Sequence, residues 1–264
     1  MPKTDVNDIQ IYYETRGEGE PLLLIAGIGQ DHNTWGLMAP RLEDRFRLIL
    51  PDNRGVGQTD MPDRTYTVEL MASDFLALLD ELAVESAHVV GHSLGAAIAF
   101  EIGRSHPDRV RKVIMMSGLY PGPQVAMPSA EAMELLTDRS GDSEDLVKRG
   151  IRAATAPGFE EREPELFQAL MQAGLNRTQP PKIYQRQSDA GALYLQEDHL
   201  AEGFEPSLLL IYGEHDQVAP VENGQRIQAE LPKAKLTVIP DAAHFLHVEQ
   251  PDRVTDAIAP FLEG

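Results

Sequence analysis

Short, mostly apolar segments, each three or four residues long, recur along most of this chain. They are rich in Leu, Ile and Val, and turns or helical patterns separate them. A continuous apolar run is typical of a strand that is buried on both faces, as in a parallel sheet between two layers of helices. The segments are Leu22–Ile25, Leu48–Leu50, His88–Val90, Val113–Met116, Leu208–Ile211 and Leu236–Ile239.

Helical periods lie between these predicted strands. One apolar face is formed by residues spaced as in an α-helix, and Thr67 is a suitable N-cap before them; the face consists of Met71, Phe75, Leu78, Leu79 and Leu82. An alternating strand at Ile9–Glu14 precedes the continuous ones. Strand and helix in repetition predict an α/β fold, with a mostly parallel central sheet, flanking helices and right-handed crossovers.

The rhythm changes at residues 120–205, which have helical patterns and no convincing strand. Because strands resume afterwards, we expect residues 1–119 and 206–264 to form one core and residues 120–205 to form a helical cap over a ligand pocket. A small independent domain is the alternative. We expect most of the regularly spaced apolar residues of this segment to be core and one or two to face the pocket; they are Leu135, Leu136, Phe167, Leu170 and Met171.

The formal charge of −19 argues against nucleic acid and anionic membrane surfaces as partners, because both would repel the chain. The absence of cysteine excludes disulfides, thiolate metal sites and a cysteine nucleophile. No apolar run approaches the roughly 18 residues that a membrane helix needs. The polar, acidic first residues do not resemble a signal peptide, so we expect a cytoplasmic protein.

The sharpest local motif is Gly91-His92-Ser93-Leu94-Gly95, between a predicted strand and an Ala-rich helical run. A serine on so tight a turn is lifted above the sheet edge, and the following helix N-terminus offers backbone N–H donors. The flanking glycines suit a turn that would crowd any side chain. Ser93 is therefore the predicted nucleophile.

A serine nucleophile needs a base, and the base needs an orienting acid. The order expected for this architecture is serine, acid, histidine. Asp216 and Glu214 follow the strand Leu208–Tyr212, and Asp216 is favoured. Of the two histidines beyond it, His244 lies in a loop after a strand and is the predicted base, whereas His247 is expected to pack.

These stretches together resemble the α/β-hydrolase fold enzymes of the esterase, lactonase and C–C hydrolase group. The resemblance rests on Leu22–Trp35, Asp52–Gly57, Gly91–Gly95, Tyr212–Pro220 and Ala243–Pro251. It implies Ser93, Asp216 and His244 as a catalytic triad, in agreement with the elimination above.

The resemblance also implies an oxyanion hole built from the backbone N–H groups of Ile28 and Leu94. Many relatives have His-Gly where this chain has Ala26-Gly27, so a side chain that usually braces the oxyanion loop is missing. Asp52 and Arg54 are interpreted as a structural turn, and Trp35 as a packing residue. His32 is close enough in sequence to the oxyanion loop to line the pocket.

The predicted reaction is cleavage of a small-molecule carboxylic ester or lactone through an acyl-enzyme, with no metal or organic cofactor. A C–C bond hydrolase, a prolyl aminopeptidase and a cofactor-free perhydrolase use the same triad and stay open as alternatives. A serine at position 93 excludes the dehalogenases and epoxide hydrolases of this fold, which use aspartate there. A ligand-binding protein without activity is disfavoured because all three triad members are present. The sequence leaves the oligomeric state open, and a homo-oligomer is one of the alternatives.

Overall fold

The computed structural model describes residues 2–119, 122, 125–138, 140–197 and 202–264. Within this part of the chain, eight strands form one sheet in the order β1-β2-β4-β3-β5-β6-β7-β8. Strands from β4 onward in this order run parallel. At one edge, β2 pairs antiparallel with both β1 and β4. Their bounds are β1 Lys3–Val6, β2 Ile9–Arg16, β3 Glu20–Ile25, β4 Phe46–Pro51, β5 Ala87–His92, β6 Val110–Met116, β7 Ser207–Gly213 and β8 Lys235–Ile239.

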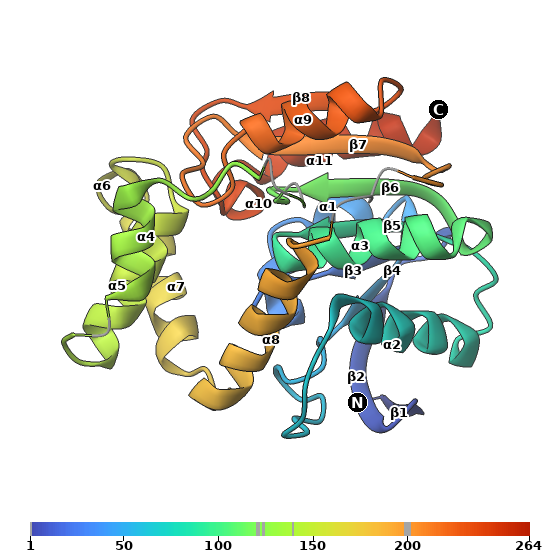
Figure 1. Cartoon of the computed structure of the whole chain (residues 1–264), viewed down its shortest axis with the longest axis horizontal. Coiled ribbons are helices and arrows are strands. Elements are labelled where there is room, and N and C mark those ends of the chain that lie inside the picture. The colour runs from blue at the N-terminus through green and yellow to red at the C-terminus, as the bar shows by residue number, and fades with distance from the viewer. Residues whose placement is uncertain (1, 120–121, 123–124, 139, 198–201) are drawn as a thin grey trace.

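The predicted mostly parallel sheet is therefore confirmed, and the β1 strand is an addition that the sequence analysis did not contain. Successive residues of β3 show why its apolar run is continuous. Leu23 and Ile25 belong to the core on one face of the sheet, and Leu22 and Leu24 to the core on the other. Because helices cover both faces, neither set of side chains reaches water (Figure 1).

The helices divide between these two cores. The core that contains Leu23 takes residues from α2 (Val68–Glu81), α3 (Leu94–Ser105) and α9 (Glu222–Glu230). The opposite core takes residues from α1 (Ala39–Leu42), α10 (Leu246–Glu249) and α11 (Pro251–Glu263). Helix α2 begins as predicted, because the Thr67 side chain accepts a hydrogen bond from the Leu70 backbone N–H at 3.1 Å.

Among the described residues, five helices lie between β6 and β7, and we call them the helical insertion. Their bounds are α4 Ala130–Thr137, α5 Ser143–Ala154, α6 Phe159–Arg162, α7 Pro164–Leu175 and α8 Pro181–Tyr194. The first four stand beside the sheet, and α8 leads back toward it (Figure 1). The insertion has a small apolar core of its own, formed by Ile151, Phe159, Phe167 and Met171. Helix α8, which the sequence analysis did not identify, instead packs against α2 and α3 through Ile183, Ala190 and Tyr194.

The turn after β4 is fixed by buried charges, as predicted for Asp52 and Arg54. The Arg54 guanidinium donates to both carboxylate oxygens of Asp74, at 2.7 and 2.8 Å, and to Asp8 at 2.9 Å. The Asp52 carboxylate accepts from the backbone N–H groups of His32 and Gln58. This turn therefore has a fixed backbone, against which the neighbouring loops and α8 rest. No helix of the described chain has the length and apolar character needed to cross a membrane.

Candidate active site

Ser93 occupies a sharp turn between β5 and α3. Its backbone is in a region that side chains rarely adopt, with φ 54° and ψ −117°. A Cβ atom added to Gly91 would lie 1.9 Å from the Gly95 carbonyl oxygen, and one added to Gly95 would lie 2.2 Å from the Ile25 carbonyl oxygen. Both glycines are therefore required for helix and strand to approach closely enough to form the turn.

Three side chains from distant parts of the sequence meet beside this turn. His244 Nε2 lies 3.0 Å from Ser93 Oγ, and His244 Nδ1 lies 3.0 Å from Asp216 Oδ2. The other oxygen of Asp216 accepts from the backbone N–H groups of Val218 and Ala219, at 2.9 and 2.7 Å. Because a carboxylate only accepts, Nδ1 of His244 carries the proton and Nε2 is left facing the serine hydroxyl. Asp216 and His244 are both buried.

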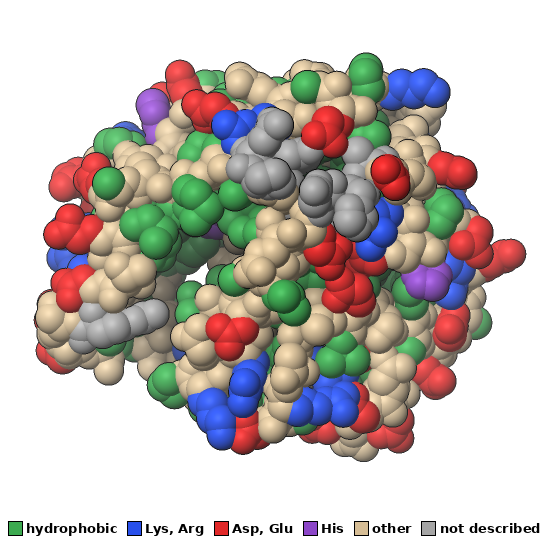
Figure 2. All heavy atoms as spheres, viewed as in Figure 1, with side chains coloured by type: hydrophobic (Ala, Val, Ile, Leu, Met, Phe, Trp, Pro, Cys, Tyr) green, Lys and Arg blue, Asp and Glu red, His purple; other side chains and the backbone are tan. Residues whose placement is uncertain are grey.

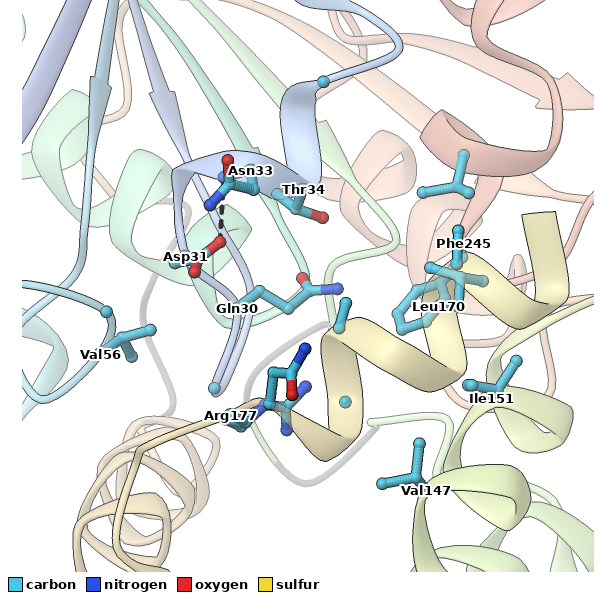
Figure 3. Close-up of a pocket in the computed structure, with 18 of the residues that line it drawn as sticks. Gln30, Asp31, Asn33, Thr34, Val56, Val147, Ile151, Leu170, Arg177 and Phe245 are labelled. Carbon is cyan, nitrogen blue, oxygen red and sulfur yellow. Dashed lines mark hydrogen bonds between the residues drawn. The ribbon is translucent and has the colours of Figure 1, made fainter. Parts of the chain in front are cut away.

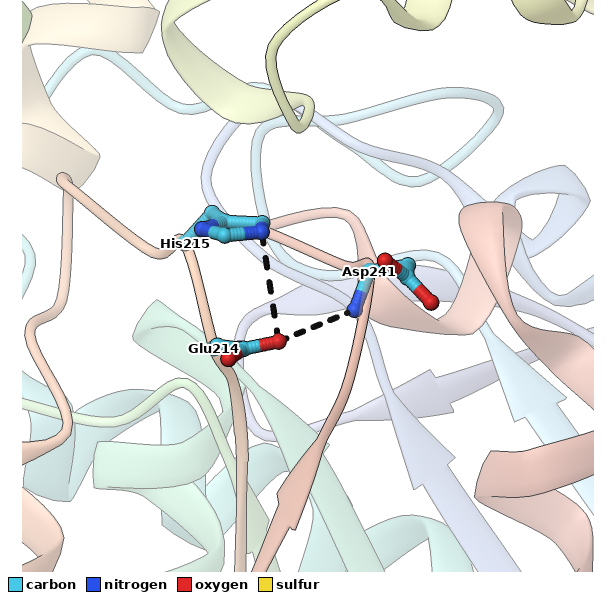
Figure 4. A group of neighbouring side chains, drawn as sticks. All are labelled: Glu214, His215 and Asp241. Atoms are coloured by element: carbon cyan, nitrogen blue, oxygen red, sulfur yellow. Dashed lines mark hydrogen bonds and ion pairs between the residues drawn. The ribbon is translucent and has the colours of Figure 1, made fainter.

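Glu214, the competing carboxylate, points toward His215 and the backbone of Asp241 (Figure 4). It is exposed, and it accepts from the Asp241 backbone N–H at 3.3 Å and lies 3.9 Å from His215. The possible ligand atoms of Glu214, His215 and Asp241 lie within 4.8 Å of one another, but all three residues are exposed. The structure therefore brings Asp216, and not Glu214, to the imidazole.

His247 packs beneath the site, as expected. It is fully buried, with its ring centroid 4.4 Å from that of His92 and 5.2 Å from that of Trp35. Burial lowers the pKa of His247 to about 3, and the neighbouring His244 acts in the same direction. Burial also holds the pKa of His92 well below its usual value, and His92 Nε2 donates to the His244 carbonyl oxygen at 2.8 Å. The hydrogen bond from His92 holds the loop that carries His244, while His247 Nε2 lies 3.0 Å from Thr34 Oγ1.

The predicted oxyanion loop passes directly over the nucleophile. A Cβ atom on Gly27 would lie 3.2 Å from Ser93 Cβ. Leu94 opens α3, so its N–H has no partner within the helix. For Ile28, no residue in the described ranges accepts a hydrogen bond from its N–H. Among the described residues, neither predicted N–H group donates to another protein group, and Leu94 directly follows Ser93.

A cavity of about 640 Å³ opens between this loop and the helical insertion (Figure 3). It reaches the oxyanion loop at Gly29 and Gln30 and the histidine loop at Phe245. Its apolar wall comes from the insertion and includes Val147, Ile151, Leu166 and Leu170. In the space-filling view, the molecule is hollowed beside the insertion, with hydrophobic side chains at the rim (Figure 2).

The five apolar residues singled out in the insertion divide as follows. Leu170 lines the cavity, whereas Phe167 and Met171 belong to the insertion's own core. Leu135 and Leu136 are half-buried and do not line this cavity. His32 does not line it either, because its buried ring faces Asp52 at 2.6 Å and Glu14 at 3.3 Å. Trp35 is fully buried in the core, as expected.

Arg177, which the sequence analysis did not single out, also lines the cavity (Figure 3). Within the described ranges, no acidic side chain forms an ion pair with its guanidinium. Asp31, the carboxylate in the same lining, accepts instead from the Asn33 backbone N–H at 3.0 Å. A cation is therefore available to a ligand in a chain whose net charge is −19.

Residues 20–251 match a family model described as the alpha/beta hydrolase fold. The chain belongs to this family. The hydrolase is 26% identical to the 2-hydroxymuconate semialdehyde hydrolase of Pseudomonas sp. strain CF600, over 93% of this chain and 88% of the relative. It is 27% identical to a thermophilic esterase from Thermogutta terrifontis, whose structure it matches with a TM-score of 0.80. The match covers 97% of this chain and 93% of the esterase. The enol-lactonase of Burkholderia xenovorans LB400 has the same fold, with a TM-score of 0.84, 23% identity and full coverage of both chains.

The low pKa of His247 generates a prediction about acid stability. Below pH 6.5 the unfolded chain protonates this histidine and the folded hydrolase does not, so the free energy of unfolding falls as the pH falls. Between pH 6.5 and 5 this group should remove about 1.6 kcal/mol, because the slope approaches about 1.36 kcal/mol per pH unit only once the unfolded histidine is mostly protonated. Asparagine does not titrate, so His247→Asn should lack this contribution to the fall in the free energy of unfolding. Urea unfolding at both pH values measures it. If the free energy of unfolding falls equally in the variant and the wild type between pH 6.5 and 5, the prediction is contradicted.

Proposed function

We propose that this hydrolase cleaves a carboxylic ester or lactone of a small molecule through an acyl-enzyme intermediate. Ser93 is the nucleophile, His244 the general base and Asp216 the residue that orients it. The observation that carries the proposal is the unbroken line of contacts from Ser93 Oγ through both nitrogens of His244 to Asp216, each 3.0 Å long. This is the geometry that base-assisted nucleophilic attack requires.

In the first half of the reaction, Ser93 Oγ attacks the substrate carbonyl carbon, and its proton moves to His244 Nε2. The carbonyl oxygen becomes an oxyanion, which the N–H groups of Ile28 and Leu94 stabilise. One such donor contributes about 3 to 4 kcal/mol in related sites. The C–O bond of the tetrahedral intermediate then breaks, and His244 gives its proton to the leaving alcohol.

In the second half, a water molecule takes the place of the alcohol. His244 Nε2 accepts one proton from the water as its oxygen attacks the acyl carbon, and the same N–H groups hold the second oxyanion. Collapse of this intermediate returns the proton to Ser93 Oγ and releases the acid. Asp216 stays ionised and stabilises the imidazolium in both halves.

The helical insertion is proposed as the cap that selects the substrate, because it forms the apolar wall of the cavity. The esterase relative supports an ester substrate. A C–C bond hydrolase is the second candidate, and the similarity to the 2-hydroxymuconate semialdehyde hydrolase favours it. Assaying aryl esters, lactones and vinylogous diketones with the same preparation separates the two.

The triad assignment predicts a ranking of variants. Ser93→Ala should fold and lose several orders of magnitude in p-nitrophenyl ester turnover. Asp216→Asn should lose about 10⁴, because an amide favours the wrong tautomer of His244. Glu214→Gln is the matched control and should stay close to wild type, since the exposed Glu214 carboxylate accepts from the Asp241 backbone and Asp216 is the carboxylate that contacts His244. The reverse ranking of the two acidic positions would refute the assignment.

The cap assignment predicts a change in acyl preference. Leu170→Ala enlarges the cavity at its apolar wall and should shift preference toward longer acyl chains by roughly tenfold, the scale on which a pocket discriminates one methylene. Leu175→Ala, an exposed position on the same helix, should leave the chain-length profile unchanged. A p-nitrophenyl ester series measures both. An unchanged profile in folded Leu170→Ala would remove the insertion from substrate selection.

The available guanidinium of Arg177 predicts a preference for substrates that carry a carboxylate. Arg177→Gln should raise the KM for p-nitrophenyl hemisuccinate by about tenfold or more, the expected cost of losing a charged hydrogen bond. The KM for p-nitrophenyl butyrate, which lacks the carboxylate, is the internal control and should stay constant. Equal effects on both esters would show that Arg177 does not recognise charge.

A further inference from the structure

One fully buried amide joins the helical insertion to the predicted oxyanion loop. Gln187, in the middle of α8, accepts a hydrogen bond from the backbone N–H of Gly29 through its Oε1 atom, at 2.9 Å. Its Nε2 atom donates to the Arg54 carbonyl oxygen, also at 2.9 Å. Both partners are backbone groups of loops that follow sheet strands. Gln187 thus links two loops at the edge of the sheet where Ser93 lies.

The orientation of this amide is fixed by its partners. A backbone N–H only donates and a backbone carbonyl only accepts, so Oε1 must face Gly29 and Nε2 must face Arg54. Gln179 donates from its own amide to Gln187 Oε1 at 3.2 Å and to the Gly55 carbonyl oxygen at 2.8 Å. The buried Arg54–Asp74 pair holds the backbone to which both glutamines are tied. The amide of Gln187 therefore has a single arrangement on a rigid support.

On the other side of Ile28, a second glutamine performs the matching role. The backbone N–H of Gly27 donates to Gln30 Oε1 at 3.2 Å. The N–H groups on either side of Ile28 are thus both occupied by glutamine carbonyl oxygens. The Ile28 N–H between them has no acceptor in the described part of the chain. Gly29 has a positive φ of 65°, so the loop bends at the residue that Gln187 holds.

We propose that Gln187 is a positioning residue that holds the oxyanion loop in the conformation in which the Ile28 N–H faces the reacting carbonyl. The proposal rests on the proposed function above. Ala26 has no polar side chain with which to brace the loop, and the buried amide from the insertion performs this task instead. A loop that is held on both sides of its donor needs little rearrangement when the oxyanion forms.

The test is Gln187→Leu, which keeps the approximate volume and removes the acceptor for the Gly29 N–H. With p-nitrophenyl acetate, kcat should fall about ten- to hundredfold, less than the roughly 10²- to 10³-fold loss on deleting an oxyanion donor. The rate of Ser93 labelling by a fluorophosphonate should fall in parallel, because its phosphoryl oxygen occupies the same position. The KM and the pH midpoint of kcat/KM should not move, since Ser93, His244 and Asp216 are untouched.

Tyr194→Phe is the matched control. Tyr194 lies on the same helix and donates a buried hydrogen bond to Glu101 at 3.2 Å, away from the oxyanion loop. Loss of this hydrogen bond should lower the free energy of unfolding but leave kcat and the labelling rate within about threefold of wild type. An equal fall in kcat for Tyr194→Phe would overturn the proposal, because general loosening of α8 would then explain both variants. A shifted pH midpoint in Gln187→Leu would also overturn it.

Gln187→Glu tests rescue, because a carboxyl group keeps an acceptor for the Gly29 N–H; its kcat should exceed that of Gln187→Leu. If Gln187→Leu does not fold, Gln187→Asn replaces it, since the shorter side chain withdraws the acceptor and should also lower kcat. Wild-type kcat in the folded Leu or Asn variant refutes the role of Gln187, while loss of turnover in Ser93→Ala shows that the proposed function still stands. Turnover that survives in Ser93→Ala refutes the proposed function itself.

Discussion

The geometry of the site depends on the backbone contact that closes the turn between β5 and α3. Gly91 approaches the Gly95 carbonyl, and Gly95 approaches the Ile25 carbonyl, at distances that leave no room for a side chain. This double contact forces Ser93 into its unusual backbone conformation and starts α3 beside the oxyanion loop. Any larger residue at either position would separate helix from strand, and Ser93 would no longer face His244.

The sheet, Ser93 and the two residues grouped with it, Asp216 and His244, could be predicted because each depends on a local pattern. Continuous apolar runs identify strands that are buried on both faces, and a glycine-flanked serine between strand and helix identifies the turn. Asp216 could be preferred to Glu214, and His244 to His247, from their positions relative to the ends of strands. In the structure His244 contacts both Asp216 and Ser93, because parallel strands bring the loops at their carboxyl ends together, whereas the edge strand β8 is partly exposed.

The parts that could not be predicted depend on contacts between distant segments. Helix α8 carries a weak apolar pattern, because its buried face includes the amide of Gln187 and the ring of Tyr194. A single glutamine gives no spacing from which its partners at Gly29 and Arg54 could be inferred. His32 was expected near the pocket from its place in the sequence. Its ring instead turns to Asp52 and Glu14, because two carboxylates offer a buried imidazole better partners.

The helical insertion is attached to the core at both loops that carry the proposed chemistry. On the histidine side, Glu249 accepts from the backbone N–H groups of Ala156 and Ala243, at 2.7 and 2.8 Å, and the Phe245 N–H donates to the Ala154 carbonyl. On the oxyanion side, Gln187 reaches Gly29. The insertion is therefore not an exchangeable module. A transplanted insertion without an equivalent of Gln187 and a partner for Glu249 would leave two loops of the recipient unsupported.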